Sequence, residues 1–232
     1  MTGAPARASD AARLALFDLD GTLLTGDTDA LWCDFLVAEG VLDGATFAAA
    51  NREVVARYAE GAIGAVEFCA FYAATLTGRS AAEWRPLRDR FVADVVVPRI
   101  AASARALVDG HRAAGDTLVL TTATNRFLTE PVAAELRIVT LIATELEVVA
   151  GRFSGRNTGV LNMREGKTVR LQAWLAASGR SERALASATF YSDSINDLPL
   201  LTAVGRPVAV DPDDRLRAEA VGRGWPVLAL AR

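Results

Sequence analysis

The chain has 232 residues, of which 51% are hydrophobic and 23% are charged. This composition supports one large folded domain, or a domain with an insert, and excludes a long disordered chain. The formal net charge of −3 excludes a basic surface for nucleic acid or anionic membrane as the main feature, so we expect neither kind of partner.

The polar segment Met1–Arg13 lacks the apolar stretch of a secretory signal, and no run approaches the roughly 18 apolar residues of a spanning helix. We therefore expect a cytoplasmic protein. Cys33 and Cys69 form neither a CxxC motif nor a disulfide framework, and their apolar surroundings predict buried thiols. The single histidine, His111, lies in a predicted helix, which indicates a surface or packing role.

The first predicted element is a buried strand, Leu14–Phe17, which ends at Asp18 and is followed by a turn at Gly21. Alanine-rich sequence without β-branched runs comes next. Glycines divide it into predicted helices near 29–39, 44–60, 65–77 and 81–94. We expect residues 27–95 to form an all-helical cap, and residues 1–26 and 96–232 to form the core.

After Pro98, strands and helices alternate. Strands are predicted at 117–121, 138–143, 188–191, 207–210 and near Val227, with a small hairpin over 145–153. Helices are predicted at 101–114, 126–136, 167–177, up to 203, and at 215–222. This order predicts an α/β fold: a Rossmann-like, doubly wound parallel sheet with helices on both faces.

Polar side chains follow several of the predicted strands. Ligands of such sheets bind beyond the carboxyl ends of the strands, so we expect Asp18, Asp193 and Thr121 or Thr122 to converge there. Asp18 and Asp20, two residues apart in extended chain, point the same way and repel each other unless a cation lies between them. An oxygen-only ligand set suits Mg²⁺, and the second acidic pair, Asp193 and Asp197, enlarges that set.

Lysine use is unusual. Of the 25 basic residues, 24 are Arg, and Lys167 is the single Lys. Either one Lys persists by chance in an arginine-biased sequence, or Lys167 fills a role that a planar guanidinium cannot fill. At the start of a predicted helix, its compact ammonium would add positive charge beside a phosphate, to which Thr122 would donate a hydrogen bond.

These motifs together resemble those of the haloacid dehalogenase superfamily of phosphatases. The resemblance rests on Asp-Leu-Asp-Gly-Thr at 18–22, Thr122 after an apolar strand, Lys167, and Asp-Ser-Ile-Asn-Asp at 193–197. It covers nearly the whole chain. The helical insert between the first two motifs is similar to the cap of the phosphoserine-phosphatase-like branch. Because Ala123 and Thr124 match that family's Ser/Thr-Ala-Ser pattern, Thr122 is preferred over Thr121 as the residue that faces the phosphate.

The resemblance implies a mechanism. Asp18 would attack phosphorus to form an aspartyl-phosphate, and Asp20 would protonate the leaving alcohol and then activate water. The implied Mg²⁺ ligands are Asp18, the backbone carbonyl of Asp20, Asp193 and Asp197. Asp197 would either bind the ion directly or support the residues that bind it. The implied phosphate-binding residues are Gly21, Thr22, Thr122, Ala123, Lys167 and Asn196.

The implied activity is Mg²⁺-dependent hydrolysis of a small-molecule phosphate monoester. Family members that dehalogenate organic acids lack a carboxylate at the position of Asp20, so dehalogenation is not expected. Two alternatives stay open: a phosphotransferase or phosphomutase with the same motifs, and a catalytically silent scaffold that acts as a binding module. No pattern in the sequence indicates an oligomeric state.

The resemblance is weaker for the substrate. Asp27 occupies the place of the acidic residue that meets the ammonium group in phosphoserine-specific relatives, but no Arg follows Glu60-Gly61 where those relatives pair with the serine carboxylate. We therefore expect an amino-alcohol phosphate such as histidinol phosphate, with phosphoserine as the alternative. Trp32, Phe71 and Tyr72 are the predicted aromatic wall beside Asp27. The cap is expected to hinge at residues 24–26 and around Pro98.

Overall fold

The computed structural model describes residues 12–231, so most of the segment Met1–Arg13 lies outside the described residues. The strands are β1 (Leu14–Phe17), β2 (Thr117–Asn125), β3 (Thr140–Val149), β4 (Arg152–Thr158), β5 (Thr189–Ser192), β6 (Arg206–Val210) and β7 (Val227–Leu228). The α-helices are α1 (Thr28–Ala38), α2 (Gly44–Ala59), α3 (Ala65–Ala73), α4 (Ala81–Phe91), α5 (Ala102–Ala113), α6 (Arg126–Glu135), α7 (Glu165–Ala177), α8 (Leu198–Ala203) and α9 (Asp214–Arg223).

One seven-stranded sheet organises the chain, in the order β4-β3-β2-β1-β5-β6-β7. All neighbouring pairs are parallel except β3 and β4, which form an antiparallel hairpin. Strand β1 lies in the middle, with β2 on one side and β5 on the other. The chain leaves β1 at this point of reversal, which is where doubly wound sheets place their ligands.

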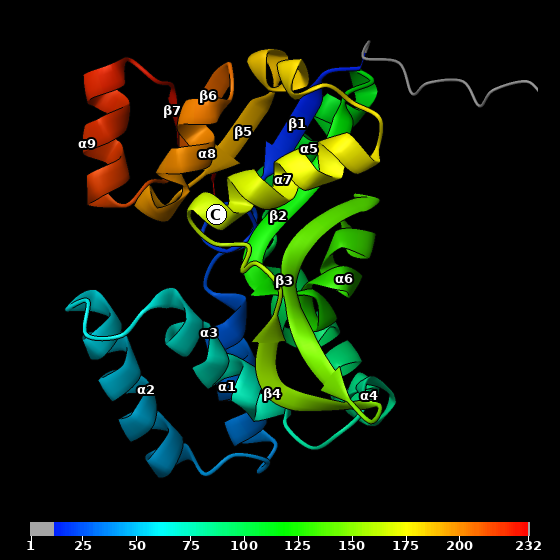
Figure 1. Cartoon of the computed structure of the whole chain (residues 1–232), viewed down its shortest axis with the longest axis vertical. Helices are drawn as coiled ribbons and strands as arrows, with labels where there is room; N and C mark the ends of the chain where they lie inside the picture. Colours follow the sequence, from blue (N-terminus) through cyan, green and yellow to red (C-terminus); the bar gives the residue numbers. More distant parts are fainter. Residues whose placement is uncertain (1–11, 232) are drawn as a thin grey trace, which may run out of the picture.

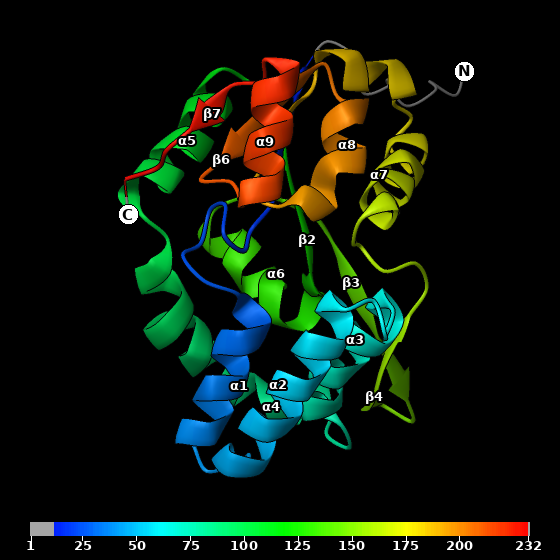
Figure 2. The ribbon, with the colours of Figure 1, turned by 90° about the vertical axis from the view of Figure 1, so that its left-hand side faces the viewer.

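Helices cover both faces of the sheet, as the sequence predicts. Along β1, Leu14 and Leu16 pack into one apolar cluster with α7, α8 and α9, whereas Ala15 and Phe17 pack into another with α5 and α6. In Figure 2, α5 and α7 lie on opposite sides of the strands. The predicted fold class, an α/β doubly wound sheet, is therefore confirmed.

The segment between β1 and β2 is helical, and we call residues 28–96 the helical insert. Its helices begin where the sequence offers capping oxygens: Asp27 accepts from Ala30 N, Asp43 accepts from Thr46 N, and Ser80 accepts from Glu83 N. A short 3₁₀ turn (Ala74–Leu76) extends α3, and a π-helical turn (Val92–Val96) extends α4. In Figure 1 the insert lies below the strands, beyond the end of the sheet that carries the residues after β1.

The hairpin of β3 and β4 reaches from the sheet down to the insert (Figure 1). Gly78 N donates to Phe153 O at 2.9 Å, and Phe153 N donates to Arg79 O at 3.0 Å. Arg152 Nη1 adds hydrogen bonds to Gly78 O at 2.6 Å and to Glu83 Oε2 at 3.0 Å. The hairpin is longer than the 145–153 expected, and it joins the insert by backbone hydrogen bonds.

Two sequence expectations need adjustment. Strand β2 runs to Asn125 and not to Thr121, with an irregular register between Thr122 and Asn125, so the polar residues expected after the strand belong to it. Cys33 is buried, as expected, but Cys69 is only partly buried because it lies at a cavity.

The described part of the chain contains no helix with the length and apolar character needed to cross a membrane. His111 has a packing role: its two ring nitrogens lie 2.7 Å from Asp116 Oδ2 and 2.8 Å from the Tyr191 hydroxyl.

Candidate active site

A cavity of about 260 Å³ lies between the carboxyl ends of β1, β2 and β5 and the helical insert. Asp18 follows β1, Thr122 belongs to β2, and Asp193 follows β5, so these side chains converge as the sheet order predicts. The lining residues are Asp18, Asp20, Asp27, Asp29, Tyr58, Phe68, Cys69, Tyr72, Thr122, Ala123, Thr124, Met163, Lys167, Asp193, Ser194, Asn196 and Asp197.

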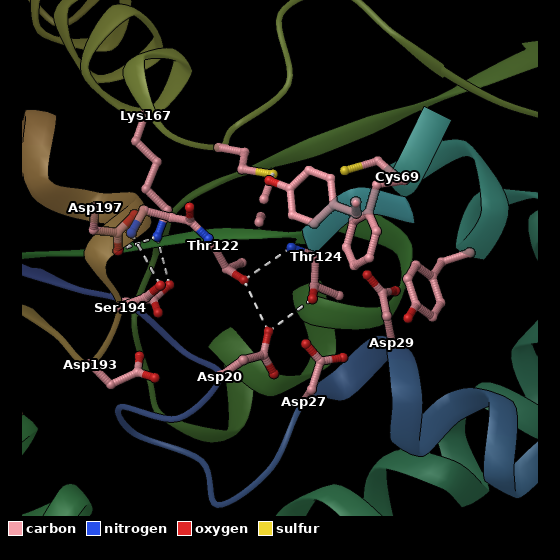
Figure 3. A pocket seen from close by; sticks show the side chains of 17 residues that line it. Asp20, Asp27, Asp29, Cys69, Thr122, Thr124, Lys167, Asp193, Ser194 and Asp197 are labelled. Atoms are coloured by element: carbon pink, nitrogen blue, oxygen red, sulfur yellow. Dashed lines mark hydrogen bonds and ion pairs between the residues drawn. The ribbon is translucent and has the colours of Figure 1, made fainter. Parts of the chain in front are cut away.

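The deepest contact is an ion pair between Asp18 and Lys167. Lys167 Nζ donates to Asp18 Oδ1 at 2.8 Å and to Asp197 Oδ2 at 2.6 Å, and its side chain is only 3% exposed. Burial alone would lower the pKa of Lys167, but the two carboxylates raise it above its ordinary value. Ser192 Oγ also donates to Asp197 Oδ2, at 2.7 Å, which fixes that carboxylate behind the lysine. Lys167 is therefore a fixed, fully charged ammonium group between two acids (Figure 3).

Asp20 lies beside this pair and is held by hydroxyl groups. Thr28 donates to Asp20 Oδ1 from its backbone N at 2.8 Å and from its hydroxyl, and Thr124 Oγ1 donates to Asp20 Oδ2 at 2.8 Å. Burial and then the neighbouring Asp27 raise the pKa of Asp20 to about 7, against the opposing hydrogen bonds. A carboxyl group with this pKa is present in both protonation states near neutral pH.

Two hydrogen bonds with Thr22 fix the position of Asp193. The Thr22 hydroxyl donates to Asp193 Oδ1 at 2.9 Å and accepts from Asp193 N at 3.0 Å. Gly21 has a φ of +75°, and a Cβ there would lie 2.1 Å from Asp193 Oδ2. Gly21 and Thr22 were expected to bind the phosphate, but neither lines the cavity, and the Thr22 side chain is turned to Asp193.

Thr122 lines the cavity, whereas Thr121 is turned into the sheet, where its hydroxyl accepts from Asn162 Nδ2 at 3.0 Å. The buried Asn162 also donates to Thr122 O and Ile142 O, both at 2.9 Å. Asn162 thus joins β2 to β3 directly behind Thr122. Asn196 lies at the rim, and its Oδ1 accepts from Arg164 Nε at 3.3 Å.

The four residues predicted to set specificity divide evenly. Asp27 and Tyr72 line the cavity, and Trp32 and Phe71 do not. Trp32 is 1% exposed and packs edge-on against Trp84 and Phe91 in the core of the insert. Phe71 stacks on Phe47 between α3 and α2. The prediction of Trp32 and Phe71 as an aromatic wall at the substrate is therefore wrong, because both rings fill the spaces between helices.

Other residues replace them at that end of the cavity. Tyr58, Phe68, Cys69 and Met163 line it, with the Tyr58 and Phe68 rings stacked at 4.4 Å between centroids. Asp29 lines the cavity as well, and the helical spacing of the sequence places it on the buried face of α1. Asp29 begins the spacing i, i+3, i+4, i+7 whose other members, Trp32, Cys33 and Leu36, are buried.

Within residues 12–231, no three or more His, Cys, Asp or Glu side chains are grouped closely enough to bind a metal ion unaided. Asp18 and Asp20 follow β1 in the chain, and Asp193 follows β5. Asp197 accepts from Lys167, and Figure 3 labels it with Asp20 and Asp193.

Comparison with known proteins gives a consistent family. The model of haloacid dehalogenase-like hydrolases matches residues 15–202. A histidinol-phosphatase of Neisseria meningitidis is 39% identical over 93% of this chain and 97% of its own length. A phosphoserine phosphatase of Mycobacterium tuberculosis is 31% identical over 94% of this chain and 71% of its own length.

Among solved structures, a protein of unknown function from Bordetella pertussis is 43% identical, with a TM-score of 0.89 over 94% of this chain and 98% of that one. A substrate-bound phosphoserine phosphatase shares the fold at 14% identity, with a TM-score of 0.67 over 95% of this chain and 93% of that one. The chain belongs to the haloacid dehalogenase-like hydrolase family.

Proposed function

We propose that the protein is a Mg²⁺-dependent phosphatase that hydrolyses a small-molecule phosphate monoester, with Asp18 as the nucleophile. The observation that carries this proposal is the buried Asp18–Lys167 pair beside Asp20, at the carboxyl end of the central strand. The family membership supports it, and so does the name of the relative that is 39% identical.

The donor set fits Mg²⁺. Six Asp side chains and a single Lys line the cavity. Burial, above all, raises the pKa of Asp18 and of Asp193, with contributions from the neighbouring carboxylates. A divalent cation would offset this excess of negative charge, and Mg²⁺ needs only one or two protein carboxylates because it keeps several waters.

The proposed ligands are Asp18, the backbone carbonyl of Asp20 and Asp193. The bond from Lys167 to Asp197 Oδ2 favours Asp197 as an outer support for this set. The bound ion would supply positive charge for the phosphoryl oxygens.

The chain's own residues would perform the chemistry in two steps. Asp18 attacks phosphorus while Lys167 holds the carboxylate in place and neutralises charge next to it. Asp20, whose pKa is about 7, donates its proton to the leaving alcohol. The resulting Asp20 carboxylate then takes a proton from the water that hydrolyses the aspartyl-phosphate. Thr122, Ala123 and Asn196, all at the cavity, would bind phosphoryl oxygens.

We propose histidinol phosphate ahead of phosphoserine as the substrate. Among residues 12–231 no Arg lines the cavity, since Arg57 pairs with Glu53 at the surface and Arg79 lies over the Trp84 ring. The carboxylate of phosphoserine would therefore lack a charge-assisted partner worth about 1.5–3 kcal/mol. The helical insert, as a cap, would exclude water from the first step.

Phosphate release from a panel of esters, with Mg²⁺ and with EDTA, tests the proposal. We expect Mg²⁺-dependent release, a preference for histidinol phosphate over phosphoserine, and loss of activity in Asp18→Asn. The matched control is Asp34→Asn, which removes an exposed carboxylate of α1. Activity that persists in Asp18→Asn contradicts the nucleophile, and inactivity on every ester favours the silent binding module. Transfer to an added alcohol instead of water identifies a phosphotransferase.

A further inference from the structure

Asp29 is one of the two cavity carboxylates, with Asp27, that the proposed reaction does not use. It is the second residue of α1, and it lies at the end of the cavity away from Lys167, beyond Asp20 and Asp27 (Figure 3). Asn125 Nδ2 lies 3.4 Å from Asp29 Oδ1, and the Thr124 hydroxyl also contacts this carboxylate. Asn125 is itself fixed, because its Oδ1 caps α6 through Leu128 N at 3.1 Å. The position of Asp29 is therefore set by the core as well as by its own helix.

The carboxyl group of Asp29 has no cationic partner within residues 12–231. In the described chain, no Arg, Lys or His lies within ion-pair distance of it, and its two polar contacts are a neutral amide and a neutral hydroxyl. Burial, followed by the nearby Asp27 and Asp20, raises the pKa of Asp29 well above its ordinary value. At the other end of the cavity Lys167 offsets the acids. At this end, a positively charged ligand would be the first group to do so.

The walls around Asp29 are aromatic and sulfur-containing. Tyr58, Phe68, Cys69, Tyr72 and Met163 line the same cavity. The Phe68 and Tyr72 rings meet edge to face at 5.3 Å, and the Tyr72 hydroxyl donates to Asn51 Oδ1 at 2.9 Å, which fixes the ring. Aromatic faces next to a carboxylate suit an organic cation with an apolar or aromatic body, and they offer nothing to a second anion.

We propose that Asp29 is the specificity-determining residue that binds the ammonium group of the leaving alcohol, in a subsite closed on its other sides by the aromatic residues of α2 and α3. This assignment rests on the proposed phosphatase activity. The phosphoryl group then lies at the Lys167 end and the cation at the Asp29 end, so one molecule would span the cavity.

Asp27 is expected to contribute less than Asp29 to binding of the ammonium group. Asp27 is exposed, and its Oδ1 already accepts from Ala30 N at 2.8 Å as the N-cap of α1. Water and salt screen an exposed carboxylate, whereas a carboxylate in a cavity wall attracts a cation through a less polar medium. The two acids therefore differ in their expected effect on selectivity, although they are two residues apart.

The experiment compares kcat/KM, at saturating Mg²⁺, for histidinol phosphate and for phenethyl phosphate, a neutral aromatic ester. The proteins are the wild-type chain, Asp29→Asn, Asp29→Ser, Asp27→Asn and the surface control Asp34→Asn. We expect wild type to prefer the cationic ester and both Asp29 variants to reduce that preference roughly 10- to 100-fold, mainly through KM. Asp27→Asn should reduce it by less, and Asp34→Asn should leave it within about twofold.

Two outcomes overturn the assignment: an unchanged preference in both Asp29 variants, or a loss confined to Asp27→Asn. Circular dichroism and thermal unfolding establish that each variant is folded. If one of Asp29→Asn and Asp29→Ser does not fold, the other still tests the assignment. If wild type hydrolyses neither these two esters nor any ester of the panel, the proposed phosphatase function has failed. If it hydrolyses other esters of the panel but not histidinol phosphate, only the ammonium subsite has failed. If it hydrolyses both without preference, only the ammonium subsite has failed.

Discussion

Lys167 Nζ lies 2.8 Å from Asp18 Oδ1, inside a site where the lysine side chain is 3% exposed. The same nitrogen lies 2.6 Å from Asp197 Oδ2, so a single ammonium group binds two carboxylates, one that follows β1 and one that follows β5. The only Lys of a chain with 24 Arg occupies this position. A compact charge meets both oxygens where a planar guanidinium would need a wider space.

We expect Lys167→Arg to retain the fold and lose activity. We expect a loss of transition-state stabilisation similar to the cost of breaking a buried ion pair, about 3–5 kcal/mol, which corresponds to roughly two to four orders of magnitude in kcat. Phosphate release at saturating Mg²⁺ measures the loss, and thermal unfolding measures the fold. Arg170→Lys, an exchange in the opposite direction on the same helix, is the control. If the turnover of Lys167→Arg is near that of wild type, the site does not require a lysine, and its presence there is a matter of chance.

Asp20 should destabilise the metal-free protein at neutral and alkaline pH. Its pKa is about 7 when folded and about 3.9 when unfolded, so its favourable contribution is present below the unfolded value and is lost as the pH rises through 7. Asp20→Asn should therefore be more stable than wild type by about 2–4 kcal/mol at pH 8, with little difference at pH 4. Denaturant unfolding in EDTA at both pH values tests this. The prediction is contradicted if the free energy of unfolding of wild type equals or exceeds that of Asp20→Asn at pH 8.

Thr22 should matter for the metal and not for the phosphate. Its hydroxyl holds both the backbone N and the carboxylate of Asp193. Thr22→Val keeps the shape and removes both bonds, and we expect the concentration of Mg²⁺ needed for half-maximal activity to rise about 10- to 100-fold. Thr22→Ser keeps the hydroxyl and should stay close to wild type. An unchanged Mg²⁺ requirement in Thr22→Val would show that Asp193 is positioned without it.

Asn162 should be a stability residue close to the site. Its Nδ2 makes three hydrogen bonds, which join Thr121, Thr122 and Ile142. Asn162→Ala removes these three buried hydrogen bonds, so we expect a loss of about 2–4 kcal/mol in the free energy of unfolding, with a lower kcat because Thr122 is no longer supported. Asn157→Ala on β4 is the control. Equilibrium unfolding and steady-state kinetics separate the two effects, and a loss below about 0.5 kcal/mol would contradict this role.

The sequence predicted the residues at strand ends well and the residues within helices less well. Asp18 and Asp193 were placed because the end of a strand in a parallel sheet determines where its next residue lies. Trp32 and Phe71 were misplaced because a helical aromatic residue faces either a neighbouring helix or a ligand, and the packing of four helices decides which. The sequence does not predict that Thr124 faces Asp20, because the irregular register between Thr122 and Asn125 is not visible in the strand pattern.

The hairpin of β3 and β4 limits how the cavity can admit a substrate. Rotation of the whole insert about residues 24–26 and Pro98 would have to break the backbone pairing of Gly78 and Arg79 with Phe153. The opposite wall is joined more weakly, through a 3.9 Å contact between the Tyr58 hydroxyl and Met163 Sδ and the Arg164 guanidinium over the Tyr58 ring. The insert is thus braced by the sheet itself through the hairpin, against which α3 also packs. In the described chain, α2 makes no such backbone pairing, so a substrate can enter on the α2 side by separation of Tyr58 from the loop before α7.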